Sequence, residues 1–186
     1  MNIFVLDKNP TRAAQMHCDK HVVKMSIEYA QLLSTAHHLL ARGDETYLSH
    51  IYKATHSKHP ATLWVAAHPA HYAWTLNLAE ATWAEYTYRY GKIHASSRLQ
   101  PWLSKVPRDI LALGPITPPP QCMPVQYHVL SESRDPWNWQ HTITAYQQYY
   151  CYEKSRFATW TKRCTPDWFV VPTMTTTSAV SFSVQI

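Results

Sequence analysis

The sequence predicts a mainly α-helical chain that folds as a single compact domain. Two observations support this: apolar residues recur three and four positions apart in three long segments, and a proline stands near the expected start of each. With 46% hydrophobic and 16% charged residues, the composition is that of a globular domain. We expect one helical domain over residues 1–165, followed by a C-terminal tail or edge segment over residues 166–186.

The first long helix is expected to begin at Asn9-Pro10, because asparagine can cap a helix and proline fits its first turn. Helical spacing continues to about Arg42, and Gly43 is a typical residue just beyond a helix end. The apolar run before this helix, residues 2–7, is expected to be a short strand or an extended N-terminal arm. The core-facing side of the helix should consist of Val22, Met25, Tyr29, Leu32, Ala36 and Leu39.

Two further long helices are expected over residues 69–91 and 135–161, with a shorter helix over residues 60–67. Residues 43–60 are rich in histidine and should form a loop with a short helix in it. Residues 106–128 contain six prolines, a density that excludes both a helix and the interior of a sheet. The expected fold is therefore three long helices, a short extended N-terminal segment and a proline-rich loop.

Net charge and glycine content limit the classes of function that the sequence supports. The formal net charge is +5 and twelve histidines can add to it below neutral pH, which modestly favours a polyanionic partner. Ordinary solvated surface charge explains the same value equally well. Only three glycines are present, at positions 43, 91 and 114, and no glycine-rich phosphate loop can be drawn from them. The sequence thus disfavours P-loop and dinucleotide-binding folds.

Cysteine spacing and hydropathy predict a cytoplasmic protein with reduced thiols. The four cysteines form no Cys-x-x-Cys pair, and the first eight residues are too short and too polar for a secretory signal. No apolar stretch approaches the roughly 20 residues that a membrane-spanning helix needs. We therefore expect no membrane partner, and a host cytoplasm if the chain is encoded by a phage.

A second stripe along the first long helix is polar. Its members also recur by three and four, so they share one helix face, about 100° around from the apolar stripe. Solvated helix faces usually hold unpatterned glutamate and lysine, whereas several histidines beside an apolar face predict a half-buried polar surface. This polar stripe consists of His17, His21, Lys24, Glu28, Gln31, Thr35 and His38, with Lys20 beside it.

Three interpretations of the polar stripe compete. In the first, its side chains form hydrogen bonds with neighbouring helices and are purely structural. In the second, His17 and His21, one turn apart, bind a metal ion, although the flanking Lys20 and Lys24 would repel a cation. In the third, Glu28 is an acid/base carboxylate with Lys24 and His21 as its partners.

Basic residues mixed with aromatic residues occur in three segments, residues 53–60, 85–92 and 149–157. Such a mixture suits a nucleic-acid surface, because the cations can contact phosphates and the rings can stack on bases. Cations at the end of a helix have a simpler explanation as well, since they compensate its dipole. The candidate nucleic-acid-binding residues are Lys20, Lys53, His56, Lys58, Arg89 and Lys92.

Several short motifs in residues 1–95 recur together in a known family. A histidine is followed seven residues later by a glutamate, a His-Pro step precedes the second long helix, and that helix ends in an acidic residue, a basic residue and glycine. The matching residues are His21 and Glu28, His59-Pro60, and then Glu85, Arg89 and Gly91. This outline resembles the pyrimidine-dimer DNA glycosylases of the endonuclease V type. The Met-Asn-Ile-Phe opening and the run His-Cys-Asp-Lys-His-Val-Val-Lys also resemble those of small phage-encoded proteins.

The resemblance implies a small, mostly helical enzyme of DNA repair or modification that flips a pyrimidine out of the duplex and cuts its glycosidic bond. The family's nucleophile is the terminal amine, which here belongs to Met1 and would form a Schiff base with the sugar. An α-amino group has a reference pKa near 8, well below that of a lysine side chain. Glu28 would stabilise the sugar cation and move protons, and Lys24 or Lys20 are fallback nucleophiles. No cofactor is expected.

Two other functions remain open from the residues alone. One is a transferase that modifies an extruded DNA base, which would use the same basic surface. The other is a non-catalytic module that binds a nucleic acid or a protein, for which Glu28 would be dispensable. In either DNA-binding case Lys53, Lys58, Arg89 and Lys92 would contact phosphates, and a tyrosine or tryptophan would fill the gap left by the flipped base.

Overall fold

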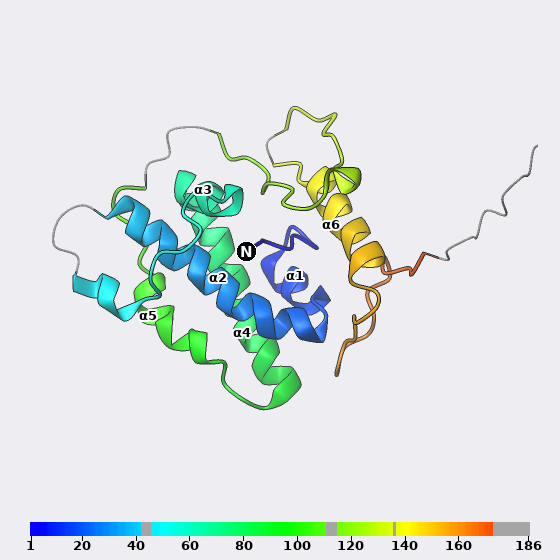
Figure 1. The fold of residues 1–186 in the computed structure, drawn as a ribbon, viewed down its shortest axis with the longest axis horizontal. Helices are drawn as coiled ribbons and strands as arrows, with labels where there is room; N and C mark the ends of the chain where they lie inside the picture. Colours follow the sequence, from blue (N-terminus) through cyan, green and yellow to red (C-terminus); the bar gives the residue numbers. More distant parts are fainter. Residues whose placement is uncertain (42–45, 111–114, 136, 173–186) are drawn as a thin grey trace, which may run out of the picture.

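Helices dominate the computed structural model, which describes residues 1–41, 46–110, 115–135 and 137–172 (Figure 1). Within these residues the chain is mainly α-helical and contains no β-strand. The α-helices are α1 (Pro10–Met16), α2 (Asp19–Leu40), α3 (Pro60–Ala67), α4 (Pro69–Tyr90), α5 (Gln100–Leu103) and α6 (Gln140–Glu153). Short 3₁₀ helices are η1 (Thr46–His50), η2 (Ala95–Leu99) and η3 (Val125–Tyr127).

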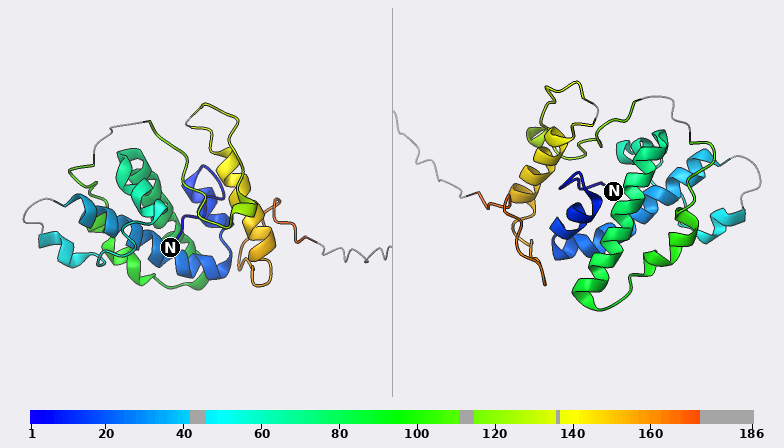
Figure 2. Two further views of the ribbon diagram at one scale, coloured as in Figure 1. Left: turned by 45° about the horizontal axis from the view of Figure 1, so that its top comes forward. Right: turned by 180° about the vertical axis from the view of Figure 1, so that it is seen from behind.

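Two 22-residue helices, α2 and α4, form the centre of the fold. They pack against each other, α1 packs on α4, and α3 packs on both. Helix α6 stands apart from this group, with the N-terminal segment between them (Figures 1 and 2). The expected apolar face of α2 is confirmed at Val22, Met25, Tyr29, Leu32 and Ala36, which are fully buried, whereas Leu39 is 43% exposed.

The N-terminal segment is extended but belongs to no sheet in the described part of the chain. Ile3, Phe4, Val5 and Leu6 are all buried in the core. Because no neighbouring strand pairs with it, its backbone uses side-chain partners, and Leu6 accepts a hydrogen bond from the Gln147 side chain on α6 (3.1 Å). Residues 2–7 were expected to form either a short strand or an extended arm, and they form the arm.

The first expected helix is two helices, because the chain breaks at His17 and Cys18. Both residues have extended backbone, with ψ of 134° and 162°. The Cys18 carbonyl accepts the first hydrogen bonds of α2, from the backbone N–H groups of His21 and Val22 (both 2.9 Å). The Cys18 N–H donates to the Tyr150 hydroxyl on α6 (3.4 Å), so a tertiary partner supports the break.

The other expected helices are reproduced in part. Helix α4 ends at Gly91, whose left-handed backbone (φ 66°) lets its N–H donate to the Thr87 carbonyl (2.8 Å). Helix α3 matches its expected range. Helix α6 (Gln140–Glu153) is shorter than expected at both ends. At its start, Asp135 accepts a hydrogen bond from the Trp137 N–H (2.9 Å) in a turn instead of beginning the helix, and the helix ends eight residues before Thr161. Pro136 lies outside the described residues.

Residues 115–128 form a loop that packs on the helices and contains only the short η3, as the prolines predict. Of the expected C-terminal segment, residues 173–186 lie outside the described residues. All four cysteines have free thiols. Among the described residues no helix combines the length and the apolar character needed to cross a bilayer.

Candidate active site

The amine of Met1 lies beside the carboxylate of Glu28 on α2. The amine nitrogen is 3.8 Å from Glu28 Oε2, and the Met1 side chain is 2% exposed. The Thr62 hydroxyl on α3 donates to the Met1 sulfur (3.6 Å). A chain terminus is usually mobile and solvated, so this one is unusual in being fixed between two helices (Figures 1 and 2).

Asn2 fixes the terminus further. Its backbone N–H donates to Glu28 Oε2 (3.0 Å), and its side-chain Nδ2 donates to the Cys122 carbonyl (2.9 Å). Its Oδ1 accepts a hydrogen bond from the Tyr146 hydroxyl on α6 (2.6 Å). Three segments far apart in the sequence therefore determine where the amine lies.

Glu28 is bounded by positive groups on both sides. Its Oε2 faces the Met1 amine, and its Oε1 is 3.3 Å from Lys24 Nζ, one helical turn away. The Glu28 side chain is 13% exposed whereas that of Lys24 is 65% exposed, so Lys24 marks the side of the site that faces solvent. This arrangement brings together Met1, Glu28 and Lys24, three of the residues expected to be catalytic.

His59 also belongs to this site, although the sequence analysis gave it no catalytic role. Its pKa is lowered by burial first, then by the positive charge of the Met1 amine and by His56, while Glu28 opposes the shift. Its Nδ1 accepts a hydrogen bond from the Ala61 N–H (3.2 Å) and so caps α3, which leaves the ring proton on Nε2. In the sequence, the His-Pro step was the feature that pointed to His59. Asn2 and Tyr146 gave no signal, because their contacts join residues that are distant in sequence.

A basic loop, which carries Lys53, His56 and Lys58, runs along the rest of the polar stripe. The Thr35 hydroxyl accepts a hydrogen bond from the Thr55 N–H (3.1 Å) and donates to the Gln31 carbonyl on its own helix (2.7 Å), with the Thr55 carbonyl 3.2 Å away. One turn further on, His38 Nε2 donates to the Tyr52 carbonyl (3.0 Å). The loop is thereby held against α2, and Lys53, His56 and Lys58 are exposed to solvent.

The structure places His21 away from Glu28, in contrast to its expected role as a partner. His21 is buried against Phe4 and accepts a hydrogen bond from the Tyr150 hydroxyl. His17 is also buried; its Nδ1 donates to the Ala13 carbonyl and its Nε2 accepts from the Tyr29 hydroxyl. Burial is the main reason that the pKa falls to about 4 for His17 and to about 2 for His21.

This half of the polar stripe fits the structural interpretation. Both ring nitrogens of His17 are already hydrogen-bonded, which leaves it no donor atom for a metal ion. Among the described residues, no group of three or more histidine, cysteine, aspartate or glutamate side chains is arranged to hold one.

Arg89, expected to bind phosphate, is buried instead. Its guanidinium donates to Glu85 Oε1 (2.7 Å), to Asp19 Oδ1 (2.9 Å) and to the Gln15 carbonyl (2.9 Å), and its side chain is fully inaccessible. It therefore ties α4 to α1 and α2 and has no free edge for a ligand. Lys20 and Lys92, which were also expected to bind nucleic acid, are exposed, as are Lys53, His56 and Lys58 on the loop.

Three cavities of the structure lie away from the amine–carboxylate pair. One is a shallow groove between α1 and α4 that includes Gln15 and Glu80, and another lies between α6 and the Trp168 segment. A third, smaller cavity lies at the C-terminal end of α2. Neither Met1 nor Glu28 lines any of the three.

Comparison of the chain with protein-family models, with curated proteins and with solved structures finds no match.

Proposed function

We propose that this chain is a DNA glycosylase with AP-lyase activity that acts on an extruded pyrimidine. The observation that carries the proposal is the pairing of the Met1 amine with the Glu28 carboxylate, 3.8 Å apart and fixed by the surrounding fold. An amine beside a carboxylate is the minimum machinery for nucleophilic attack on a sugar carbon with proton transfer.

In the proposed reaction the amine lone pair attacks C1′ of the deoxyribose. The C1′–N bond breaks and its electron pair leaves with the base, which takes up a proton. The nitrogen then passes one proton to Glu28, and its lone pair forms the C1′=N bond as the C1′–O4′ bond breaks. The ring oxygen O4′ takes up the proton from Glu28, which leaves an opened sugar joined to the protein by a protonated Schiff base. Removal of a C2′ proton next expels the 3′ phosphate by β-elimination, and water releases the amine. Glu28 serves each step by stabilising positive charge at C1′ and by moving the protons.

The terminal amine is a better candidate nucleophile than Lys24. Nucleophilic attack requires a neutral amine, and α-amino groups lose their proton at lower pH than lysine side chains do. The Met1 amine is also held by its surroundings, with its side chain 2% exposed, whereas the Lys24 side chain is 65% exposed. We assign Lys24 to charge balance beside Glu28 and to contact with a phosphate.

The surface around the pair favours a nucleic-acid substrate. Lys20 and Lys24 are exposed on α2 on one side of Glu28, and Lys53 and Lys58 are exposed on the loop held against the same helix. Cations on both sides of a reactive centre can hold the phosphates that flank one extruded nucleotide.

The proposal is tested by strand cleavage at an abasic site in duplex DNA. The wild-type protein should cleave by β-elimination, and Glu28→Gln should lower the rate by about 10²–10⁴-fold, because the amide keeps the shape but cannot take up protons. Glu80→Gln, a glutamate on α4 that hydrogen-bonds Gln100, is the matched control and should keep full activity.

Equal rates for Glu28→Gln and the wild type would remove Glu28 from the mechanism. DNA binding without cleavage would contradict the lyase and favour the base-modifying transferase or the non-catalytic binding module.

A further inference from the structure

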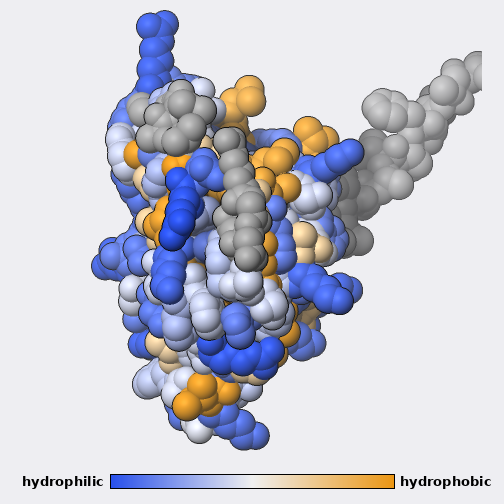
Figure 3. Space-filling model, turned by 90° about the vertical axis from the view of Figure 1, so that its left-hand side faces the viewer, coloured by the Kyte–Doolittle hydropathy of each residue, from blue (hydrophilic) through white to orange (hydrophobic). Residues whose placement is uncertain are grey.

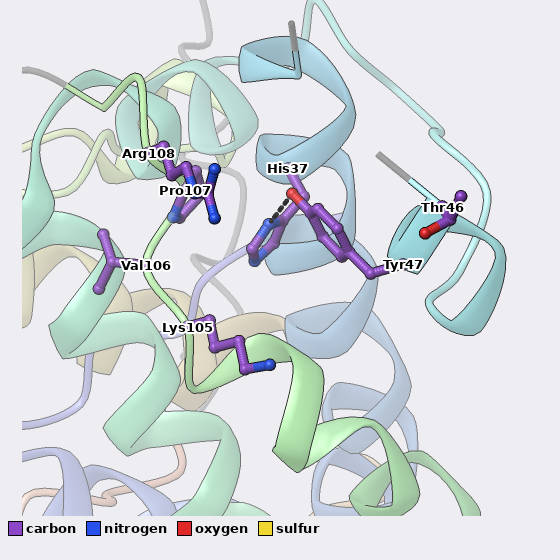
Figure 4. A pocket seen from close by; sticks show the side chains of 7 residues that line it. All are labelled: His37, Thr46, Tyr47, Lys105, Val106, Pro107 and Arg108. Atoms are coloured by element: carbon purple, nitrogen blue, oxygen red, sulfur yellow. Dashed lines mark hydrogen bonds between the residues drawn. The ribbon is translucent and has the colours of Figure 1, made fainter. Parts of the chain in front are cut away.

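A small cavity lies at the end of the molecule opposite α6, between the C-terminal end of α2, η1 and the segment that follows α5 (Figure 4). Its volume is about 240 Å³. The surface at this end of the molecule is mainly hydrophilic (Figure 3). The cavity is lined by His37, Thr46, Tyr47, Lys105, Val106, Pro107 and Arg108.

Two cations enter the cavity from one segment. The side chains of Lys105 and Arg108 both extend toward the His37–Tyr47 wall, while Val106 points away (Figure 4). Within the described residues neither cation forms a salt bridge, and Lys105 packs only over the Trp102 ring, 5.5 Å from its centroid. Of the described residues that line the cavity, Lys105 and Arg108 are cationic and none is acidic.

The opposite wall is held in a defined arrangement. The Tyr72 hydroxyl donates to the Leu103 carbonyl (2.7 Å) and therefore accepts a hydrogen bond from His37 Nε2 (2.8 Å). In the neutral ring, Nδ1 then accepts from the Tyr47 hydroxyl (3.0 Å; dashed line in Figure 4). His37 is 1% exposed, so the core fixes this residue of the wall.

The cavity is separate from the amine–carboxylate site. His37 and Glu28 are nine residues apart on α2, which corresponds to about 13.5 Å along the helix and to opposite faces, about 180° apart. A nucleotide reacting at Met1 would not reach the cavity around this helix, so its ligand is a different molecule.

We propose that this cavity binds a small phosphate-bearing molecule, either inorganic phosphate or a phosphomonoester. The Arg108 guanidinium offers the planar pair of N–H donors that matches a phosphate, and Lys105 adds a compact positive charge. The volume is below the 300–1,000 Å³ typical of larger organic ligands, which fits a small anion.

Isothermal titration of the full chain with inorganic phosphate at constant ionic strength tests the proposal. We expect saturable binding that sodium chloride does not reproduce. The double variant Lys105→Gln, Arg108→Gln should weaken binding about a hundredfold, since one charged hydrogen bond contributes about tenfold. Both side chains are exposed, so the variant should fold. The control, Lys8→Gln with Arg12→Gln, removes the same two charge types from exposed positions outside the cavity and should bind as the wild type does.

Equal phosphate affinity in the two double variants, or no saturable binding in the wild type, would overturn the proposal. Titration with a deoxynucleoside 5′-monophosphate and with unphosphorylated duplex DNA identifies the source of the phosphate. A free ester should compete with inorganic phosphate for the cavity, and competition by the duplex alone would contradict a small-molecule site.

Discussion

At the scale of single residues, the start of α2 depends on two buried neutral histidines. His17 and His21 are hydrogen-bonded to the hydroxyls of Tyr29 and Tyr150, and burial lowers the pKa of each histidine far below its ordinary value. His17 also lowers the pKa of His21, because two positive rings so close together would repel each other. Both rings therefore stay neutral in the folded protein at pH values where exposed histidines are charged.

Folding stability should fall as the pH drops below about 6.5. In that range the unfolded chain protonates its histidines near their ordinary pKa, but the native protein does not bind the protons until about pH 4 at His17 and about pH 2 at His21. Well below pH 6.5, each of the two costs about 1.4 kcal/mol of unfolding free energy per pH unit until its native pKa is reached. Urea unfolding at pH 7, 6 and 5 measures the loss, and an unfolding free energy that stays constant over this range would contradict it.

The candidate site shows which residues a sequence pattern can bring together. Glu28 and Lys24 share a helix face at a spacing of four, so their contact was predictable, and Met1 entered through the family resemblance. The support from Asn2 and Tyr146 spans 144 positions and was not predictable, because no local pattern records a contact at that separation. Arg89 failed as a phosphate ligand for the same reason: its distant partner Asp19 could not be foreseen.

At the scale of helices, apolar spacing located α2, α3 and α4 but missed the break before α2. Helix breaks are usually signalled by proline or glycine, and His17-Cys18 contains neither. The break is supported by Tyr150 on α6, which binds both the Cys18 N–H and His21. The sequence likewise predicts that the third long helix starts at Asp135-Pro136. The hydrogen bond that Asp135 accepts forms a local turn there instead.

Asp19 joins the start of α2 to the C-terminal segment. Its carboxylate accepts hydrogen bonds from the Thr161 N–H (2.9 Å), from the hydroxyls of Thr159 and Thr161 (both 2.9 Å) and from Arg89 (2.9 Å). Burial alone would raise the pKa of Asp19, but these donors lower it overall. One carboxylate thus connects three parts of the fold.

Asp19→Ala should cost about 3 kcal/mol of unfolding free energy, because it leaves the buried Arg89 guanidinium with one partner fewer. Urea unfolding measures this cost. Amide hydrogen exchange should also become faster in residues 157–163, which lose their attachment to α2. Asp167→Ala removes an exposed aspartate on the same segment and is the control. Equal unfolding free energies for the two variants would show that Asp19 has no such role.

At the scale of the whole molecule, the net charge of +5 is modest. Some of the positive side chains are paired with carboxylates within the fold, whereas others are exposed to solvent. Arg89 and Arg163 are paired with Glu85 inside or at the edge of the fold, where they hold helices and the C-terminal segment together. Lys20 and Lys24 remain exposed on α2, and Lys53 and Lys58 remain exposed on the loop held against it. The proposed DNA surface therefore depends on a small set of lysines around one site.

The salt dependence of DNA binding tests that surface. Each phosphate contact contributes about 0.9 to the slope of log affinity against log salt concentration, so the double variant Lys53→Gln, Lys58→Gln should reduce the slope by about 2. Arg12→Gln, an exposed cation on α1, should leave the slope unchanged. Fluorescence anisotropy with a short duplex at several salt concentrations gives the slope, and no change in the lysine variant would place the DNA elsewhere on the molecule.

The central claim is that the Met1 amine attacks the sugar, and borohydride trapping tests it most directly. Borohydride reduces a Schiff base between the protein and an abasic duplex to a stable adduct, whose position in the chain peptide mass spectrometry then identifies. We predict an adduct on the Met1 nitrogen that is lost when the N-terminus is acetylated beforehand. An adduct on Lys24 or Lys20, or no adduct while the duplex stays bound, would contradict the claim.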